Sequence, residues 1–333
     1  MTVRAFSYPR NLDEALAQLA VLTRDVQDLR EWFFRYHVSS TQGAALAGQG
    51  SVEPEAPQPL SISPWHWDVT CLGHFEVRCA GKVVPACPSR RGQAILAYLL
   101  ASAHHVALRD VLMETFWPDA APESGAHNMQ MAISALRHTL RGCGPNAGDD
   151  AILFDADHYF LNPALLIELD VDGFRDAANR GLRAAAVGMD TAVGLCEEAR
   201  RRYTGAYFAH CPYDGWVEQQ RGTLQDLYLR VLDRLSTLYG REGDWDGAAG
   251  CCHDILALDP FQEDAYQQLM RCYAAKDYPA GIQRAYRQCR EVLWRDLCVT
   301  PAEETERLYQ SLMKARLLRS AEMEEDWSAR LTY

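Results

Sequence analysis

The segment from Pro88 to Arg141 repeats apolar residues at the three- and four-residue spacing of amphipathic helices, and it predicts three short helices in succession. The first covers about Ser89 to Ser102 and the second about Leu108 to Phe116, where Pro118 stops it. The apolar positions of the first are Ala94, Ile95, Tyr98 and Leu99, and the second offers Leu108, Val111, Leu112 and Thr115 on one side. Each helix therefore has one side to bury.

The third helix is predicted from a cap at Asp119, through Pro122 and Glu123 in its first turn, to Arg141, where Gly142 ends it. Its apolar line, which we expect to be buried, is Met129, Ile133, Leu136 and Leu140. The opposite side presents His127, Met131, Ser134 and His138, with Gln130, Arg137 and Arg141 on one flank. That side carries hydrogen-bonding groups and cations, and it has no carboxylate.

Short β-strands are predicted on both sides of these helices. Before them, the segments WDVTCLG, HFEVRC and KVVP read as strands, with turns at Gly73 and at Ala80-Gly81. After them, two apolar runs, Ile152–Phe154 and Tyr159–Leu161, flank a four-residue Asp-rich turn and predict a β-hairpin. Strands, three helices and then a hairpin is the order of a winged helix.

The exposed side of the third helix suits the reading of a DNA major groove. Gln, Ser and His offer donors and acceptors to base edges, and arginines offer cations to phosphates. The helix pattern alone leaves a simpler interpretation open, in which this is the solvated side of a surface helix. The hairpin that follows favours the DNA-binding interpretation.

The chain resembles the OmpR-type winged helix of the SARP family, activators of bacterial secondary-metabolite gene clusters, in LGHFEVRCAGKVV, RRGQAILAYLL, LRDVLMETFWPD, NMQMAISALRHTL and LDVDGF. The resemblance covers about residues 65–175, and its most specific part is FWPD followed by a helix ending in Leu136-Arg137. It implies that the third helix enters the major groove, the wing touches the minor groove or backbone, and the first helix begins near phosphate. The expected DNA-binding residues are Arg90, Arg91, His127, Gln130, Met131, Ser134, Arg137, His138 and Arg141.

Charge sets a limit on this interpretation. The chain has a formal net charge of −12, and residues 66–176 hold eight Lys/Arg against fourteen Asp/Glu. Local sign matters more than total sign, because potentials decay over about 10 Å at physiological salt. We therefore expect weak non-specific DNA binding and a need for several protomers. Asp155 and Asp157 in the wing weigh against a contact between the wing and DNA.

Residues 11–38 are predicted to form an amphipathic helix with coiled-coil spacing, because every a and d position of four heptads is apolar. The expected dimerisation residues are Leu12, Leu19, Leu22, Val26, Leu29, Phe33 and Tyr36. A helix folded back on the carboxy-terminal domain is the alternative. Residues 39–64, rich in Gly, Pro, Ser and Gln, are predicted to be a flexible linker.

Residues 176–317 are predicted to be all helical, with helices near Met189–Tyr203, Gly215–Tyr239, Asp246–Ala257, Gln262–Ala275, Pro279–Trp294 and Pro301–Ala315. Trp245 and Tyr278 recur about 33 residues apart, close to the period of tetratricopeptide (TPR) repeats. From GWVEQQRG to ETERLYQSL the region resembles the bacterial transcriptional activation domain of SARP proteins. Cys298 stands where that domain commonly has glycine, which predicts a reshaped turn. Residues 318–333 are expected to be a tail.

Catalysis has little support in the sequence. The motifs GxxxxGK[ST], GxSxG, HExxH and GxGxxG are absent, and the histidines lack metal-ligand spacing, so we expect no enzyme, cofactor or metal. The eleven cysteines include no CxxC pair and are predicted to be reduced and mostly buried, with His210-Cys211 packing in a loop. The longest apolar run, Ala94–Ala101, is too short to span a membrane.

The predicted fold class is mainly α with a small β component: a winged helix-turn-helix and a TPR-like α-helical repeat domain, preceded by a coiled-coil-like helix. The expected function is a sequence-specific DNA-binding transcriptional activator, cytoplasmic and nucleoid-associated. Its expected partners are double-stranded promoter DNA, RNA polymerase and further copies of itself, with no membrane. The alternative is a protein-interaction adaptor that uses the repeat groove and coiled coil without touching DNA.

Overall fold

A computed structural model describes residues 65–144, 151–211 and 214–330, with the side chains of the last helix described as far as Arg316. The predicted coiled-coil helix at 11–38 and the linker at 39–64 lie outside the described residues. So do all the residues expected to dimerise: Leu12, Leu19, Leu22, Val26, Leu29, Phe33 and Tyr36.

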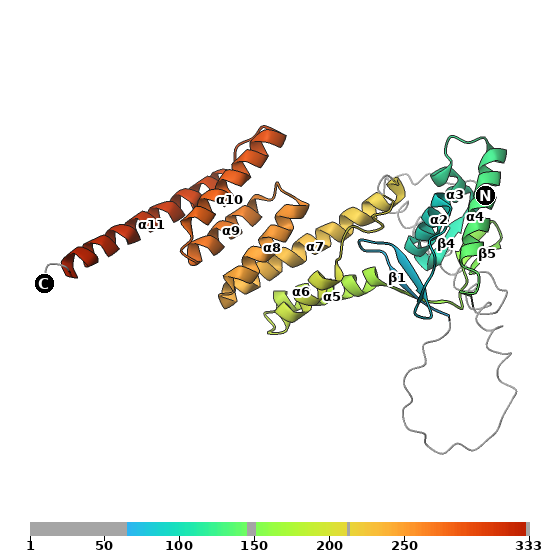
Figure 1. Ribbon diagram of the computed structural model, residues 1–333, viewed down its shortest axis with the longest axis horizontal. Helices are drawn as coiled ribbons and strands as arrows, with labels where there is room; N and C mark the ends of the chain where they lie inside the picture. Colours follow the sequence, from blue (N-terminus) through green and yellow to red (C-terminus); the bar gives the residue numbers. More distant parts are fainter. Residues whose placement is uncertain (1–64, 145–150, 212–213, 331–333) are drawn as a thin grey trace, which may run out of the picture. The chain divides into compact units, whose positions relative to one another are not determined.

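The described chain begins with a small sheet whose strand order is β3-β2-β1-β7 (Figure 1). Strands β1 (His66–Thr70), β2 (Glu76–Cys79) and β3 (Lys82–Val83) lie where short strands were predicted, and they pair antiparallel. Strand β7 (Leu166–Leu169) was not predicted, and it pairs parallel with β1. Its Leu-Ile-Glu-Leu alternation is too short to be separated from the helix that follows it, so only the pairing with a distant strand reveals it.

Three helices follow the sheet, as predicted: α2 (Arg90–Ala101), α3 (Arg109–Phe116) and α4 (Pro122–Thr139). Ser89 caps α2 by accepting a hydrogen bond from the Gly92 amide at 3.0 Å. The predicted cap of α4 at Asp119 is wrong, because α4 begins after Ala121, with Pro122 in its first turn and no side-chain cap. The proline has no amide of its own, so it leaves one unpaired amide fewer at the start of the helix.

Gly92 permits the close packing of α2 against α4. A Cβ at this position would lie 3.0 Å from the Cys87 sulfur and 3.1 Å from the Ala132 carbonyl oxygen. The start of α2 is therefore seated against the middle of α4, with no room for a side chain between them.

The predicted hairpin is present and is joined by a third strand, giving the order β4-β6-β5 for β4 (Val106–Leu108), β5 (Ile152–Asp155) and β6 (His158–Leu161). The strands extend farther than predicted, so that the connecting turn has two residues, Ala156 and Asp157. Both have positive φ, 45° and 62°, as a tight hairpin turn requires. Leu108, expected inside the second helix, lies in β4 and is exposed.

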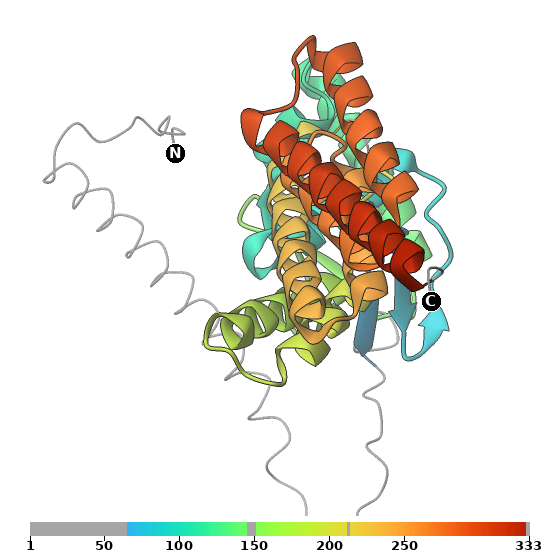
Figure 2. The same cartoon turned by 90° about the vertical axis from the view of Figure 1, so that its left-hand side faces the viewer.

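The rest of the described chain is helical. Its helices are α5 (Asp170–Ala186), α6 (Ala192–Arg202), α7 (Gly215–Glu242), α8 (Trp245–Leu258), α9 (Glu263–Ala275), α10 (Pro279–Val292) and α11 (Glu303–Arg330). Neighbours in the chain pack on one another from α5 to α11, a succession that Figures 1 and 2 both show. Trp245 and Tyr278 stand at the starts of α8 and α10, so the 33-residue spacing relates two successive helix pairs.

Two details of this part differ from the expectations. The last helix continues beyond Ala315, through most of the predicted tail, to Arg330. Cys298 adopts the left-handed conformation, with φ at 56°, after a turn of π-helix at Leu293–Leu297. The turn therefore keeps the backbone geometry that glycine would provide, although the side chain is cysteine.

The end of β1 is bound to both the start of α5 and the segment before α7. The Asp170 carboxylate accepts hydrogen bonds from the amides of Cys71 (2.9 Å) and Leu72 (3.1 Å). Leu72 also forms a bridge with Tyr207, and its carbonyl accepts a bond from the Thr204 hydroxyl at 2.6 Å. The amino-terminal sheet and the helices after it therefore share one hydrophobic core.

Candidate nucleic-acid interface

Helix α4 has the two sides that its sequence predicted. Met129, Ile133, Leu136 and Leu140 are buried. Five of the residues expected to face DNA from this helix are exposed: His127, Gln130, Met131, Ser134 and His138. Arg137 is half-buried. Arg141 is exposed but lies just beyond the helix, which ends at Thr139 and not, as predicted, at Arg141. Met131 is 61% exposed, a high value for an apolar side chain. The helix therefore presents a free surface rather than a second packing face.

The carboxy-terminal end of α4 is fixed by two hydrogen bonds. The buried Trp67 of β1 donates its indole N–H to the Cys143 carbonyl at 3.0 Å. Arg137 donates its Nε–H to the Ile152 carbonyl at 3.0 Å, which ties α4 to the first strand of the wing. Arg137 is therefore a positioning residue of the helix as well as a cation.

A concavity lies between α4 and the wing. Its lining combines five of the predicted residues with two others: Gln130, Ile133, Ser134, Arg137, His138, Arg141 and Tyr159. The structure thus brings together the carboxy-terminal half of α4, Arg141 just after it and a side chain of β6. His127 and Met131 are exposed on the same helix but do not line this concavity.

Tyr159 was missed by the analysis of the sequence. Its ring is 4.6 Å from that of Phe154 on the neighbouring strand, and Phe154 is itself 45% exposed. Aromatic residues at facing positions of a hairpin are the signal that could have identified the pair. At the tip of the same hairpin Asp155 and Asp157 are exposed, so the described wing, residues 151–161, offers aromatic and acidic groups but no lysine or arginine.

The charge of the α4 surface comes from its final turns. After Glu123 the helix contains no carboxylate, and its last turn carries Arg137 and His138. A cation near a helix carboxy terminus is stabilised by the helix dipole. Among the described residues, no carboxylate pairs with Arg141, so its charge is available to a ligand.

Arg90 and Arg91 stand in the first turn of α2 and are exposed. Within the described chain neither pairs with a carboxylate. The first turn of α2 also leaves amide groups free, a combination that suits a phosphate. Since Gly92 packs on Ala132, this turn begins beside the middle of α4.

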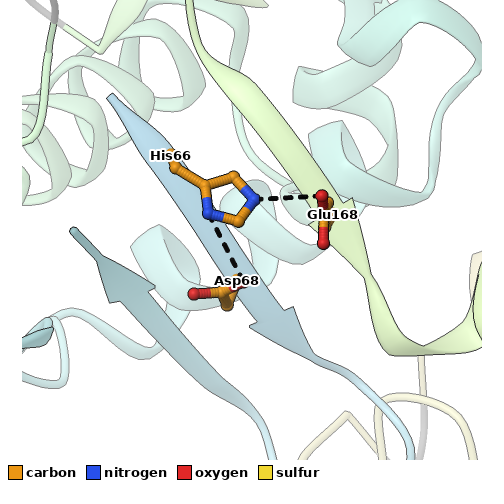
Figure 3. Close-up of side chains that lie close together, drawn as sticks. All are labelled: His66, Asp68 and Glu168. Atoms are coloured by element: carbon orange, nitrogen blue, oxygen red, sulfur yellow. Dashed lines mark ion pairs between the residues drawn. The ribbon is translucent and has the colours of Figure 1, made fainter. Parts of the chain in front are cut away.

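A histidine lies between two carboxylates on the amino-terminal sheet (Figure 3). His66 Nδ1 is 3.6 Å from Asp68, and its Nε2 is 3.3 Å from Glu168 on β7. Within the described chain these three side chains form one group whose ligand atoms could surround a metal ion, all within 4.8 Å of one another. Each ring nitrogen faces a different carboxylate, however, whereas a metal ion would take one nitrogen. The arrangement suits an imidazole that holds β7 to β1.

The cysteines are all free, and ten of the eleven are at least half-buried, as predicted; Cys298 is exposed. Burial, together with the nearby Asp214, raises the pKa of Cys211 to about 12. Its neighbour His210 stacks on Phe75 with ring centroids 4.5 Å apart. A thiol with a raised pKa is a poor nucleophile, so these two residues do not support covalent catalysis.

Helices long and apolar enough to cross a membrane are absent from the described part of the chain.

Comparison with known proteins identifies the helical part. Residues 169–313 match the model of the bacterial transcriptional activator domain. The transcriptional regulatory protein MoaR1 of Mycobacterium tuberculosis is 26% identical over 245 residues, which are 73% of this chain and 78% of that protein. MoaR1 of Mycobacterium bovis matches to the same extent.

One solved structure shares the fold. Mycobacterium tuberculosis EmbR, in complex with a low-affinity phosphopeptide, matches with a TM-score of 0.60 and 21% identity. The match covers 75% of this chain and 65% of EmbR, so this chain spans less than two thirds of that protein. The mainly helical fold class with small sheets is confirmed. The matched model is that of a transcriptional activator domain, and MoaR1 is named a transcriptional regulatory protein; neither is described as an enzyme. The chain has the two-part organisation of SARP-type regulators, a winged helix followed by a bacterial transcriptional activator domain, as the resemblance predicted.

Proposed function

We propose that this chain is a sequence-specific DNA-binding transcriptional activator, acting in the cytoplasm on a promoter of a secondary-metabolite gene cluster. One observation carries the proposal: the exposed side of α4 has donors, acceptors and cations, and no carboxylate after Glu123. That the related MoaR1 is named a transcriptional regulatory protein supports it.

In this proposal α4 enters the major groove. Gln130 and Ser134 hydrogen-bond base edges, and Met131 contacts a thymine methyl group. His127 and His138 lie at the two ends of the same surface. Arg141, Arg90 and Arg91 bind phosphates, while Arg137 holds the helix against β5. These assignments separate residues that read sequence from residues that set affinity.

The rest of the chain has supporting roles. We propose residues 65–175 as the DNA-binding domain and 176–317 as the domain that contacts RNA polymerase. With a net charge of −12, one protomer binds DNA weakly. Homodimers or higher oligomers, joined through the predicted helix at 11–38, compensate by engaging two sites at once.

A gel shift with a promoter fragment recovered by genome-wide mapping of bound DNA tests this function. His138→Ala combined with Arg141→Ala should weaken binding at least about tenfold, through loss of a phosphate contact and a groove contact. Arg201→Ala is the matched control, because Arg201 is an exposed cation in the last turn of α6. Equal binding by the double variant and wild type, with helical content intact, overturns the site.

The second candidate is a protein-interaction adaptor, which the exposed acidic wing tip favours. A heparin column separates the two functions. A DNA-binding protein is retained and elutes with a steep dependence on salt, whereas an acidic adaptor flows through.

A further inference from the structure

The end of β2 and the segment after α4 bring two cysteine thiols into contact. Cys143 lies just after α4, and its side chain is hydrogen-bonded to that of Cys79, the last residue of β2. The pairing of β1 with β2 places Cys79 opposite Trp67, whose indole N–H binds the Cys143 carbonyl at 3.0 Å. The Cys143 amide donates to the Leu140 carbonyl, also at 3.0 Å. The fold therefore holds both members of the thiol pair in place.

The thiol pair lies at the edge of the core. Cys143 is half-buried, and Cys79 keeps 8% of its surface exposed. A second hydrogen-bonded pair, Cys252 on α8 and Cys272 on α9, differs in this respect, because both of its residues are 0% exposed. A small oxidant in solution therefore reaches Cys79 and Cys143 more readily than the pair between the helices.

The two thiols differ in how they hold their protons. Burial and the neighbouring Cys79 raise the pKa of Cys143 to about 12, so Cys143 keeps its proton and donates the hydrogen bond. Cys79 is then the sulfur that reacts first with an oxidant. Once Cys79 carries an oxygen it is no longer a thiolate, and its part in raising the pKa of Cys143 disappears. The Cys143 sulfur can then act as the second nucleophile.

We propose that Cys79 and Cys143 form a reversible disulfide when a hydroperoxide oxidises them. The Cys79 thiolate takes one oxygen from hydrogen peroxide, whose O–O bond breaks, and the hydroxide released takes up the proton that Cys79 lost. Cys143 then attacks the sulfur of the Cys79 sulfenic acid, so that an S–S bond forms, the S–O bond breaks and water leaves with the Cys143 proton. Two thiols and one peroxide give one disulfide and two waters. Cellular thiols reduce such a bond again.

The disulfide acts on the end of α4. An S–S bond is about 2 Å long, so two hydrogen-bonded sulfurs must move closer to form it. Cys79 is held between β1 and β3, whereas Cys143 follows a glycine turn at Gly142 and can shift. Arg141, on the other side of that glycine, is thereby drawn toward β2, which should weaken its phosphate contact. This consequence rests on the proposed DNA-binding function, whereas disulfide formation does not.

Disulfide mapping of the full chain tests the site. Reduced wild type is exposed to hydrogen peroxide, alkylated in denaturant and digested without reductant. Mass spectrometry should find the peptides of Cys79 and Cys143 joined, and dithiothreitol should release them. Absence of the joined peptides, or an equal yield of joined Cys252 and Cys272 peptides, overturns the proposal.

Serine variants separate the roles of the two cysteines. Cys143→Ser removes the second thiol, so the joined peptides should be lost, and dimedone, which labels sulfenic acids, should label Cys79 instead. Cys298→Ser is the matched control, since Cys298 is exposed and lies in the turn before α11; it should give the wild-type yield. Loss of the joined peptides in C298S, or no dimedone adduct on Cys79 in C143S, overturns the assignment.

The effect on DNA binding has a separate test. In the gel shift, peroxide should lower the affinity of wild type about fivefold more than that of C143S, as expected for one weakened phosphate contact. An equal loss in both proteins would come from another oxidised group, such as the exposed Met131, and overturns the regulatory role. The joined peptides form without DNA, so failure of the gel shift leaves the disulfide to be decided by the mapping.

Discussion

Helices α4 and α6 both end in cationic side chains, but the two helices differ in whether carboxylates one turn earlier pair with them. The last turn of α6 carries Arg200, Arg201 and Arg202, and that of α4 carries Arg137 and His138. Both arrangements suit the helix dipole. In α6, however, Glu197 pairs with Arg200 at 3.2 Å and Glu198 pairs with Arg202 at 2.8 Å, each within one turn.

The network around α6 extends to other helices. Arg200 binds Asp254 of α8 at 2.7 Å, and Glu197 accepts a hydrogen bond from Tyr239 of α7 at 2.8 Å. Burial would lower the pKa of Arg200, but its bonds to Asp254 and Glu197 outweigh that effect and raise it. Arg200 and Arg202 are therefore paired within the fold, whereas Arg201 is exposed.

The difference lies in the carboxylates three and four residues earlier. Where they are present, arginines at the end of a helix are neutralised and join helix to helix. On α4 such carboxylates are absent, so no acidic neighbour on the same helix pairs with its terminal cations. A cluster of arginines therefore indicates an anion-binding surface only where no carboxylate one turn away pairs with them.

Giving α4 a carboxylate like those of α6 should have the largest effect. Ser134→Glu places an acid three residues before Arg137 and four before His138, on the surface proposed to face DNA. Repulsion from phosphates and loss of a groove contact should reduce affinity about 100-fold, measured by fluorescence anisotropy. Thr223→Glu, at an exposed position of α7, is the control and should bind as wild type. Unaltered binding of S134E would show that this side of α4 does not meet DNA.

Salt should separate the free cations from the paired ones. If Arg141 binds a phosphate, Arg141→Ala should make the slope of log Kd against log salt shallower by about 1. Arg202→Ala should leave the slope unchanged, because that cation is already paired within its helix. Anisotropy titrations at several salt concentrations measure both, and identical slopes for R141A and wild type contradict the phosphate contact.

Removing Arg200 should destabilise the helical domain without changing DNA recognition. Arg200→Ala removes two ion pairs and leaves the Asp254 carboxylate without its partner. This should lower the free energy of unfolding by about 1–3 kcal/mol. Thermal unfolding by circular dichroism measures the change for Arg200→Ala, Asp254→Ala and the double variant. Additive effects in this cycle would mean that the pair contributes nothing. DNA affinity well below the Tm should match wild type.

The smallest effect is expected for Arg202→Ala. Its pair with Glu198 spans four residues on the surface of one helix, and the Arg202 side chain is 48% exposed. Such a pair contributes about 0.3–0.5 kcal/mol. A loss of stability as large as that of Arg200→Ala in the same unfolding experiment would contradict the distinction between the two arginines.

Local patterns predicted most of the elements. The three helices of the winged helix, the hairpin and the succession of later helices all came from periodicity and from proline and glycine positions. The errors concern features that depend on distant partners. Strand β7 exists because β1 lies beside it, and β4 exists because it pairs with β6. A stretch of three or four residues is too short for its own sequence to indicate such a pairing.

The candidate surface was predicted in the same way and with the same limits. The exposed residues of α4 follow from 3.6 residues per turn once one side is known to be buried. Tyr159 was missed because a hairpin residue reaches the concavity only after the wing folds against α4. The sequence did not indicate whether Arg137 faces solvent or the protein interior, because its hydrogen bond to the Ile152 carbonyl joins two separate elements.

The sequence by itself determined which helices form, which side of each is apolar, and that α4 carries cations without nearby carboxylates, because these properties depend on neighbours within one or two turns. The tertiary structure decided which distant groups meet: Trp67 with Cys143, Phe75 with His210, and α4 with the wing. Those contacts join residues far apart in the chain. They arise only when the shared core brings the elements together, and no local pattern encodes them.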